Sequence, residues 1–345
     1  MTRVVHAFTA GGQERLTQSA MKGGQGLHQV AEPVTAMDSG HAEGGGSCRH
    51  EAAYYNGAKD YLPAVMPFIE EGLSAAEPVL ALVPMPAAEL LRERLNGQGR
   101  GLTFSDMGRL GRNPGRIISA MWDFIAQHPG RSVRVLGEAI WPARSAAEVS
   151  ETVRHEVLIN QAFAGTPVTL LCPYDIGQLA PRITAQAGRT HPVIRTALGL
   201  EPSPDYVAGR VPRAAARPLP PPPADAEQLT YARDLRSVRM LVARHAERAG
   251  LDADRTADLV LAAGEVCANT LRHTTGLGTV WVWHRRAEVI CQVNDQGWIT
   301  DPLAGRRRPP EASGLGLWVV HQVCDLVQMR TGRRGTTIRM HMGLV

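Results

Sequence analysis

Four consecutive prolines at 220–223 prevent the middle of this 345-residue chain from forming a helix interior or a central strand. They belong to a proline-dense segment, residues 201–228, whose composition favours a semi-rigid extended linker. Residues 1–46 are rich in Gly, Ser, Thr and Gln without periodicity, which predicts disorder. The chain is therefore expected to form two domains, at 47–200 and 229–345, as its length also allows.

The overall composition is that of an ordinary soluble globular protein, with 44% hydrophobic and 20% charged residues. No apolar run approaches the roughly 20 residues that span a bilayer, and the N-terminus lacks the apolar core of a signal peptide. A net charge of +4 with only short basic clusters argues against a direct nucleic-acid partner. Five cysteines without a C-x-x-C pair exclude a disulfide framework and a zinc ribbon. We expect a cytoplasmic protein without a membrane partner.

The first domain alternates between helical and strand patterns from position 48 to about 175. Short apolar runs such as PVLALVPM and PVTLLCPYD are typical of buried strands, and amphipathic segments separate them. Residues 176–200 have the pattern of a further helix. Strands that alternate with helices predict an α/β domain with a mostly parallel sheet covered by helices on its faces.

The second domain has a different element order. Two helices come first, followed by two adjacent alternating strands, a helix that opens with glycine, and a last strand. This order predicts an α/β sandwich in which helices cover one face of a mixed sheet.

A selective polar stripe occupies one face of the second helix in this domain. Glu265, Asn269, Arg272 and His273 follow each other at helical spacing, so their side chains share one face. The apolar residues Leu261, Val266 and Leu271 are expected elsewhere around the helix. The question is whether the polar face meets water or lines a site.

Two other segments have a chemistry that complements this stripe. In NDQG, residues 294–297, Asp295 ends a strand and can accept a hydrogen bond from the exocyclic amine of adenine. In SGLGL, residues 313–317, glycines open a helix whose backbone N–H groups can bind phosphates. Asn269 offers a neutral oxygen to Mg²⁺, and Glu265 can accept a proton from an attacking hydroxyl. Together the three segments predict a nucleotide pocket.

With these motifs in this order, residues 230–343 resemble the GHKL ATPase fold shared by gyrase, histidine kinases and anti-sigma factor kinases. GEVCANTLRH resembles its N box, NDQG its adenine-binding D-x-G box and GLGLWVV its glycine box, while GTT at 335–337 resembles a further nucleotide-contact position. The L-x-x-V-R pattern at 235–239 is similar to that of anti-sigma factor serine/threonine kinases of the RsbW/SpoIIAB type.

The resemblance implies a role for each matching residue. Glu265 would be the catalytic base, Asn269 the Mg²⁺ ligand and Asp295 the adenine reader. The implied nucleotide-binding residues are Asn269, Arg272, His273, Asp295, Gly297, Gly314, Leu315, Gly316, Thr336 and Thr337. The segment 300–313 would be a short basic lid whose arginines meet phosphates or a partner, or lie in a solvated loop. ATP and Mg²⁺ are the implied cofactors.

The implied function is that of an anti-sigma factor or a serine/threonine protein kinase acting on an antagonist protein. Its partners would be a sigma factor, an anti-anti-sigma protein of the STAS type, or both, and the chain could form a homodimer. The alternative is a non-catalytic ATP-binding module that sequesters its partner. An atypical histidine kinase is disfavoured because the linker stands where a phosphoacceptor hairpin belongs, and His245 lies on the domain's own first helix.

The first domain resembles the MEDS sensory domain, on segments such as RHEAAYYN, VLGEAIW, RHEVLIN and LLCPYD. The resemblance implies sensing of a small-molecule or protein signal. His50, Glu138 and Glu156 come from different elements and could converge at strand ends, where open sheets hold ligands. Such a trio can hold a metal, although buried polar residues satisfied by hydrogen bonds are commoner. No G-x-x-x-x-G-K-[ST] motif is present, so no P-loop is expected.

Overall fold

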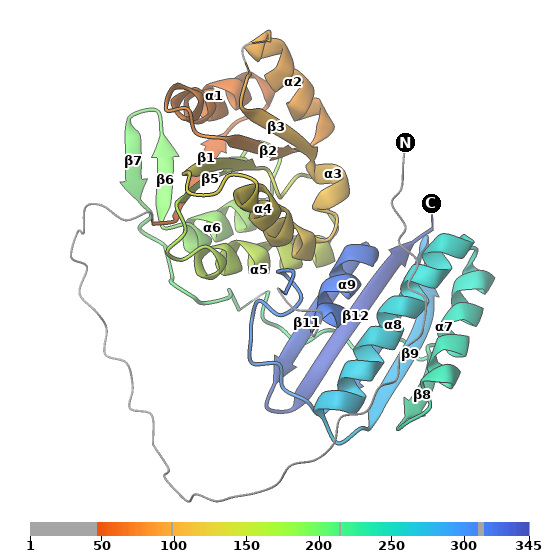
Figure 1. Cartoon of the computed structure of the whole chain (residues 1–345). Helices are drawn as coiled ribbons and strands as arrows, with labels where there is room; N and C mark the ends of the chain where they lie inside the picture. Colours follow the sequence, from red (N-terminus) through yellow and green to blue (C-terminus); the bar gives the residue numbers. More distant parts are fainter. Residues whose placement is uncertain (1–46, 98, 214, 310–313, 345) are drawn as a thin grey trace, which may run out of the picture. The chain divides into compact units, whose positions relative to one another are not determined.

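A computed structural model describes residues 47–97, 99–213, 215–309 and 314–344. The predicted disorder of residues 1–46 therefore lies outside the described residues. The described chain after that point belongs to one compact unit that contains two sheets (Figure 1). The first part of the described chain forms one sheet, and the rest of it forms the other.

The first sheet has seven strands in the order β3-β2-β4-β5-β1-β6-β7, parallel throughout except for β7. This confirms the predicted α/β fold with a mostly parallel sheet. The strands are β1 (Arg49–Tyr55), β2 (Val79–Val83), β3 (Leu102–Asp106), β4 (Val133–Gly137), β5 (Val168–Asp175), β6 (Val193–Thr196) and β7 (Gly199–Pro202). The helices are α1 (Ala58–Ser74), α2 (Met85–Leu95), α3 (Met107–Leu110), η1 (Pro114–Arg116), α4 (Ile117–Ala126), α5 (Ala146–Ala162) and α6 (Pro181–Thr190).

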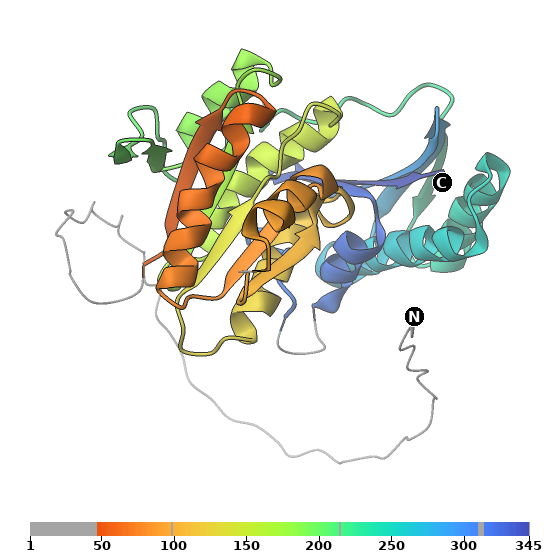
Figure 2. The ribbon, with the colours of Figure 1, turned by 90° about the horizontal axis from the view of Figure 1, so that it is seen from above.

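Helices cover both faces of this sheet. This arrangement explains why strand β2 is apolar at every position. Successive side chains of a strand point to opposite faces. Leu80 and Leu82 enter a core with residues of α4 and α5, whereas Ala81 and Val83 enter a second core with residues of α1 and α2. A strand in a sheet with helices on both faces (Figure 2) must be apolar at every position, as in the run VLALV.

The helix predicted over 176–200 is shorter than expected. Helix α6 ends at Thr190, and the hairpin β6–β7 follows it. Pro192 disfavours a helical conformation at the preceding residue, and Gly199 adopts a φ of 133° in the hairpin turn. The sequence analysis predicted one helix across this segment and missed these two breaks.

The second sheet has five strands in the order β11-β12-β10-β9-β8, and every pair is antiparallel. The predicted mixed sheet is therefore wrong, although the α/β layering is right. The strands are β8 (Glu227–Tyr231), β9 (Gly278–Arg285), β10 (Glu288–Asp295), β11 (Leu326–Gly332) and β12 (Gly335–Gly343). Strands β8 and β11 were not expected. Strand β8 is a short, mostly exposed edge strand, so it lacks the buried alternation that reveals a strand in a sequence.

Three helices cover one face of this sheet: α7 (Leu235–Ala249), α8 (Ala253–His273) and α9 (Leu315–Val323) (Figure 1). Val238 and Leu241 of α7 and Val266 of α8 share a core with the sheet residues Val280 and Met340. The apolar face of α8 is thereby fixed against the sheet, which leaves its polar stripe free to line a cavity.

Candidate nucleotide-binding site

A cavity of about 1050 Å³ opens beside helix α8 in the C-terminal domain. The predicted stripe of Glu265, Asn269, Arg272 and His273 lines it, so these side chains face one common space. Helix α8 is held at its start by Asp252, whose side chain accepts a hydrogen bond from the Arg255 N–H at 2.8 Å. Leu261 and Val266 also line the cavity, which corrects the expectation that the apolar residues lie away from the polar ones.

The second wall is the end of strand β10. Asp295 accepts a hydrogen bond from the Thr270 hydroxyl at 2.7 Å and another from the Gly297 N–H at 2.8 Å. Thr270 itself accepts from the Tyr231 hydroxyl at 2.9 Å. The Asp295 carboxylate is thus held in one orientation at the cavity wall by groups from a helix and from its own turn.

The third wall is the start of helix α9. Gly314 adopts a φ of 90° at the helix N-cap, and no side chain of the described residues caps the helix there. The first backbone N–H groups of α9 are therefore without a side-chain acceptor and face a cavity lined by Gly314, Leu315 and Gly316.

At Gly316, the wall formed by α9 meets the wall formed by α8. A Cβ atom at this position would lie 2.7 Å from Glu265 Oε2 and 3.5 Å from Asn269 Nδ2. The carboxylate and the carboxamide of α8 therefore rest directly against the backbone of α9, and a Cβ atom at this position would push the Glu265 carboxylate aside. The predicted base and the predicted metal ligand lie together at the N-terminus of a helix, where negative charge is stabilised.

Strand β12 supports the turn that follows Asp295. The Thr336 hydroxyl donates to the Gly297 carbonyl at 2.8 Å and lines the cavity. A Cβ atom at Gly335 would lie 2.2 Å from the Asp295 carbonyl oxygen, so β12 can approach the turn this closely only through a glycine. Thr337, by contrast, does not line the cavity, because the alternation of the strand points it to the opposite face.

The cavity also has apolar lining residues that the sequence reasoning missed. Trp298, Ile299 and Ile338 line it, and the Trp298 side chain is 56% exposed. Trp298 directly follows the D-x-G turn, so an exposed aromatic residue next to that motif was a usable signal. A partly apolar wall suits the flat faces of a purine ring.

The predicted lid contributes less to the cavity than expected. Thr300 and Asp301 line it, but Arg306 is 3% exposed and lies 3.6 Å from Glu151 of helix α5. Arg307 stacks on Trp122, and Arg308 on Trp318. None of these three arginines lines the cavity, so neither a phosphate contact nor a fully solvated loop describes Arg306. Residues 310–313 of the predicted lid lie outside the described residues.

Comparison with family models gives one match in each of the two domains. Residues 229–342 match the histidine kinase-like ATPase domain, and residues 49–192 match MEDS, described as the methanogen/methylotroph, DcmR sensory domain. The chain carries a MEDS domain followed by a histidine kinase-like ATPase domain. No curated protein sequence matches the chain. The pairing of a sensory domain with an ATPase domain of this kind supports a signalling regulator that binds ATP.

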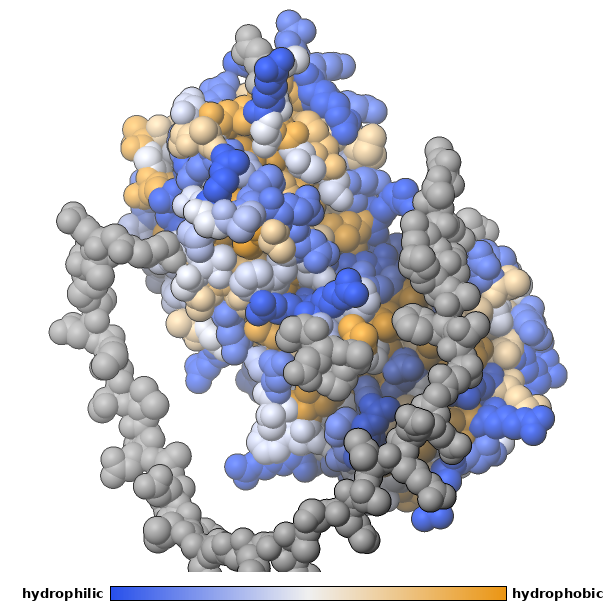
Figure 3. All heavy atoms as spheres, viewed as in Figure 1, coloured by the Kyte–Doolittle hydropathy of each residue, from blue (hydrophilic) through white to orange (hydrophobic). Residues whose placement is uncertain are grey.

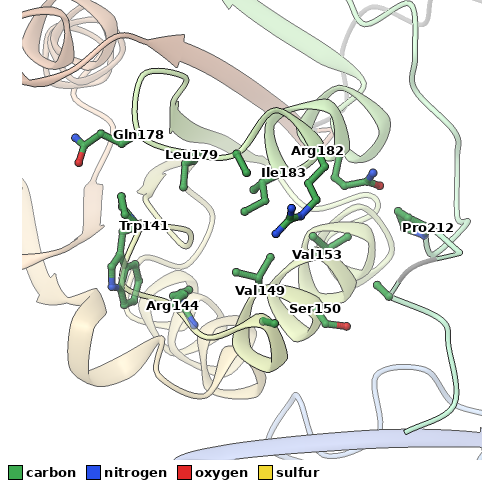
Figure 4. A pocket seen from close by; sticks show the side chains of 15 residues that line it. Trp141, Arg144, Val149, Ser150, Val153, Gln178, Leu179, Arg182, Ile183 and Pro212 are labelled. Carbon is green, nitrogen blue, oxygen red and sulfur yellow. The ribbon is translucent and has the colours of Figure 1, made fainter. Parts of the chain in front are cut away.

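The MEDS domain has a cavity of its own, of about 480 Å³. Val149 and Val153 of α5 and Ile183 of α6 line it together with Trp141 and Leu179, and Figure 4 shows these side chains around one space. Two arginines, Arg144 and Arg182, also line it. Such a lining suits a small, mostly apolar ligand with a polar or anionic group.

The three polar residues singled out in the MEDS sequence do not form one group. His50 Nε2 lies 3.3 Å from Glu156 Oε2, but Glu138 is part of a different cluster. Its Oε1 accepts a hydrogen bond from the Tyr55 hydroxyl at 2.9 Å. Burial raises the pKa of the Glu138 carboxyl to about 7.

The described residues contain no helix with both the length and the apolar character needed to span a bilayer. The face of the molecule shown in Figure 3 mixes hydrophilic and hydrophobic residues.

Proposed function

We propose that this chain is an anti-sigma factor kinase: it binds Mg-ATP in the ATPase-domain cavity and phosphorylates a serine or threonine of an antagonist protein. The antagonist would be an anti-anti-sigma protein of the STAS type, and the regulated partner a sigma factor. The observation that carries the proposal is the position of Glu265, whose carboxylate rests against Gly316 at the N-terminus of α9 and beside Asn269.

The lining residues fit a magnesium-bound adenine nucleotide. Asp295 presents a fixed carboxylate at the end of β10 for an exocyclic amine, with Trp298 and Ile338 as apolar neighbours. The open N-terminus of α9 offers backbone N–H groups for phosphate oxygens. The Asn269 amide oxygen, which also accepts a hydrogen bond from Arg272 at 3.3 Å, is a suitable Mg²⁺ ligand.

Bound Mg-ATP would supply the γ-phosphoryl group, with ADP as the leaving group, and its Mg²⁺ would neutralise part of the phosphate charge. The residues of the chain then act mainly by position. Glu265 accepts the proton of the incoming serine or threonine hydroxyl, and the N-terminus of α9 stabilises the negative charge that develops beside it. Arg272 and His273, both exposed at the end of α8, are placed to contact phosphates or the entering substrate.

Control by the MEDS domain has a physical route in helix α5. Val149 and Val153 on this helix line the MEDS cavity. Glu151, on the same helix and 1% exposed, pairs with Arg330 of β11 at 2.6 Å and lies near Arg306 of the lid segment. A ligand that shifts α5 therefore acts on the lid and on the edge strand of the ATPase sheet.

The test is phosphotransfer from labelled ATP to a purified antagonist protein, measured beside ATP binding by calorimetry. Glu265→Gln should keep ATP binding and lower phosphotransfer by about 10²–10⁴-fold, the usual contribution of a general base. Glu247→Gln, which changes an exposed glutamate of α7, is the matched control and should behave as the wild type. Full activity in Glu265→Gln would remove its role as base. Tight ATP binding without any transfer would instead favour a partner-sequestering module.

A further inference from the structure

Four side chains able to bind a metal meet inside the MEDS domain, far along the chain from one another. They are His50 on β1, Glu156 on α5, Cys172 on β5 and His191, which directly follows α6. All four are buried, and each offers one ligand atom within 4.8 Å of the other three. Strands β5, β1 and β6 are neighbours in the sheet, so the fold itself brings these distant positions together.

Four of the six separations between the ligand atoms match those of a tetrahedral site, and all six are within 4.8 Å. His50 Nε2 lies 3.3 Å from Glu156 Oε2 and 3.4 Å from Cys172 Sγ. Glu156 Oε2 lies 3.5 Å from His191 Nε2 and 3.6 Å from Cys172 Sγ. Bond lengths of about 2.0–2.3 Å around a tetrahedral zinc ion correspond to ligand–ligand separations of roughly 3.3–3.6 Å.

The two imidazole rings are oriented as metal ligands are. His191 Nδ1 lies 2.8 Å from the Ala187 carbonyl, which cannot donate and therefore holds a proton on Nδ1. His50 Nδ1 lies 3.2 Å from Asn160 Oδ1, and the Asn160 amide is fixed by its donation to the Thr190 carbonyl at 2.9 Å. A proton on each Nδ1 leaves each Nε2 with a lone pair, and this backbone or amide support is typical of histidines that bind metals.

The lone pair of His50 Nε2 faces a weak donor, the Cys172 thiol at 3.4 Å, and that of His191 Nε2 has no donor among the described residues. His191 Nε2 is buried and makes no hydrogen bond, and it faces an anionic carboxylate oxygen rather than a donor. Two imidazole lone pairs and a carboxylate that converge in a buried space repel one another and lose their hydration. A cation at the centre of the four atoms converts each of these unfavourable contacts into a coordinate bond.

We propose that His50, Glu156, Cys172 and His191 form a closed four-ligand site for a divalent transition-metal ion of the zinc type. The mixture of two imidazoles, one thiolate and one carboxylate suits a borderline-soft ion better than Mg²⁺ or Ca²⁺, which bind through oxygen. With four protein ligands and no exposed position, the site has the form of a structural one.

The site has a consequence for the MEDS cavity. Glu156 belongs to α5 and His191 directly follows α6, and these two helices supply Val153 and Ile183 to the wall of the cavity. A metal ion bound to both residues would tie the middle of α5 to the C-terminal end of α6. Its removal should therefore loosen the cavity as well as the edge of the sheet.

The test uses the full-length chain purified without a histidine tag and analysed by mass spectrometry for metals. We expect about one zinc ion per chain, and a thiolate-to-metal charge-transfer band after replacement by Co²⁺. Cys172→Ser should abolish that band, and His191→Gln should weaken Zn²⁺ affinity by at least about 100-fold, since loss of a supporting residue alone costs 10–100-fold. Cys291→Ala, which removes a buried thiol from the ATPase sheet, should change neither result.

Wild-type measurements decide the matter even when a variant fails to fold. A wild-type chain that contains no stoichiometric metal and binds neither Zn²⁺ nor Co²⁺ after treatment with chelator would overturn the proposal. The four residues would then form a buried polar cluster held by hydrogen bonds alone. Unchanged Zn²⁺ affinity in a folded Cys172→Ser variant would also contradict it.

Discussion

Replacement of Gly316 by alanine should separate the stability of the ATPase domain from its chemistry. Gly316 lies in the first turn of α9, where alanine is favoured over glycine by about 1 kcal/mol. The new Cβ atom would stand 2.7 Å from Glu265 Oε2, which is too close, but this oxygen is the far end of a flexible side chain. The carboxylate can therefore move away without a shift of the backbone.

The two effects have very different sizes. Turning the Glu265 side chain away from its preferred rotamer costs about 0.5–1.5 kcal/mol, which roughly cancels the gain in helix propensity. The free energy of unfolding should thus change by no more than about 1 kcal/mol. Phosphotransfer should fall by about 100-fold, because a displacement of a catalytic group by about 1 Å has an effect of this order.

Chemical denaturation and a phosphotransfer assay on the same preparation measure both effects. Gly264→Ala is the matched control: it is a buried helix glycine in the same domain, and its added Cβ atom would lie 3.4 Å from Arg239 Nε, within ordinary contact. It should raise stability by up to about 1 kcal/mol and leave phosphotransfer unchanged. A Gly316→Ala variant with wild-type turnover would refute the assignment of Glu265 and Gly316 to one reacting site.

Three further predictions concern other groups. Asn269→Ala should abolish the Mg²⁺-dependent part of nucleotide binding in calorimetry; equal ATP affinity with and without Mg²⁺ in the wild type would contradict the assignment. Glu138 keeps its proton in the folded state up to a pKa of about 7, against 4.5 when unfolded, so its contribution to stability is lost as pH rises through this range. Glu138→Gln should therefore gain stability over the wild type between about pH 5 and 8, by up to about 3 kcal/mol, in denaturation measured at each pH. Glu151→Gln leaves Arg306 and Arg330 without their buried partner and should lower the free energy of unfolding by about 3 kcal/mol; a change below about 0.5 kcal/mol would show that the pair is not formed.

The nucleotide-binding walls could be predicted because each of them is local in the sequence. The stripe from Glu265 to His273 needs only the period of a helix, and the turn at Asp295 needs only a strand followed by a D-x-G pattern. The uniformly apolar run of β2 likewise predicts a strand that is buried on both faces. In each case neighbouring residues contain all the information that the prediction uses.

The features that escaped prediction depend on distant partners. Arg306 is buried because Glu151 lies beside it, and the two are more than a hundred positions apart in the sequence. Cys172 and His191 join His50 only through the strand order β5-β1-β6, which no spacing rule contains. The antiparallel edge strand β8 carries too few buried residues to produce an alternating pattern.

Helix α5 takes part in the MEDS cavity, in the proposed metal site and in the contact with the ATPase sheet. Val149 and Val153 line the MEDS cavity. Glu156 lies less than four ångströms from each of the other three proposed metal ligands. Glu151 pairs with Arg330. Packed elements move as units with few alternative positions, so a displacement at one of these environments is felt at the others. A metal ion that holds Glu156 would restrict how α5 moves. Occupation of the MEDS cavity would then act on the lid mainly by turning this helix about Glu156, rather than by unfolding it.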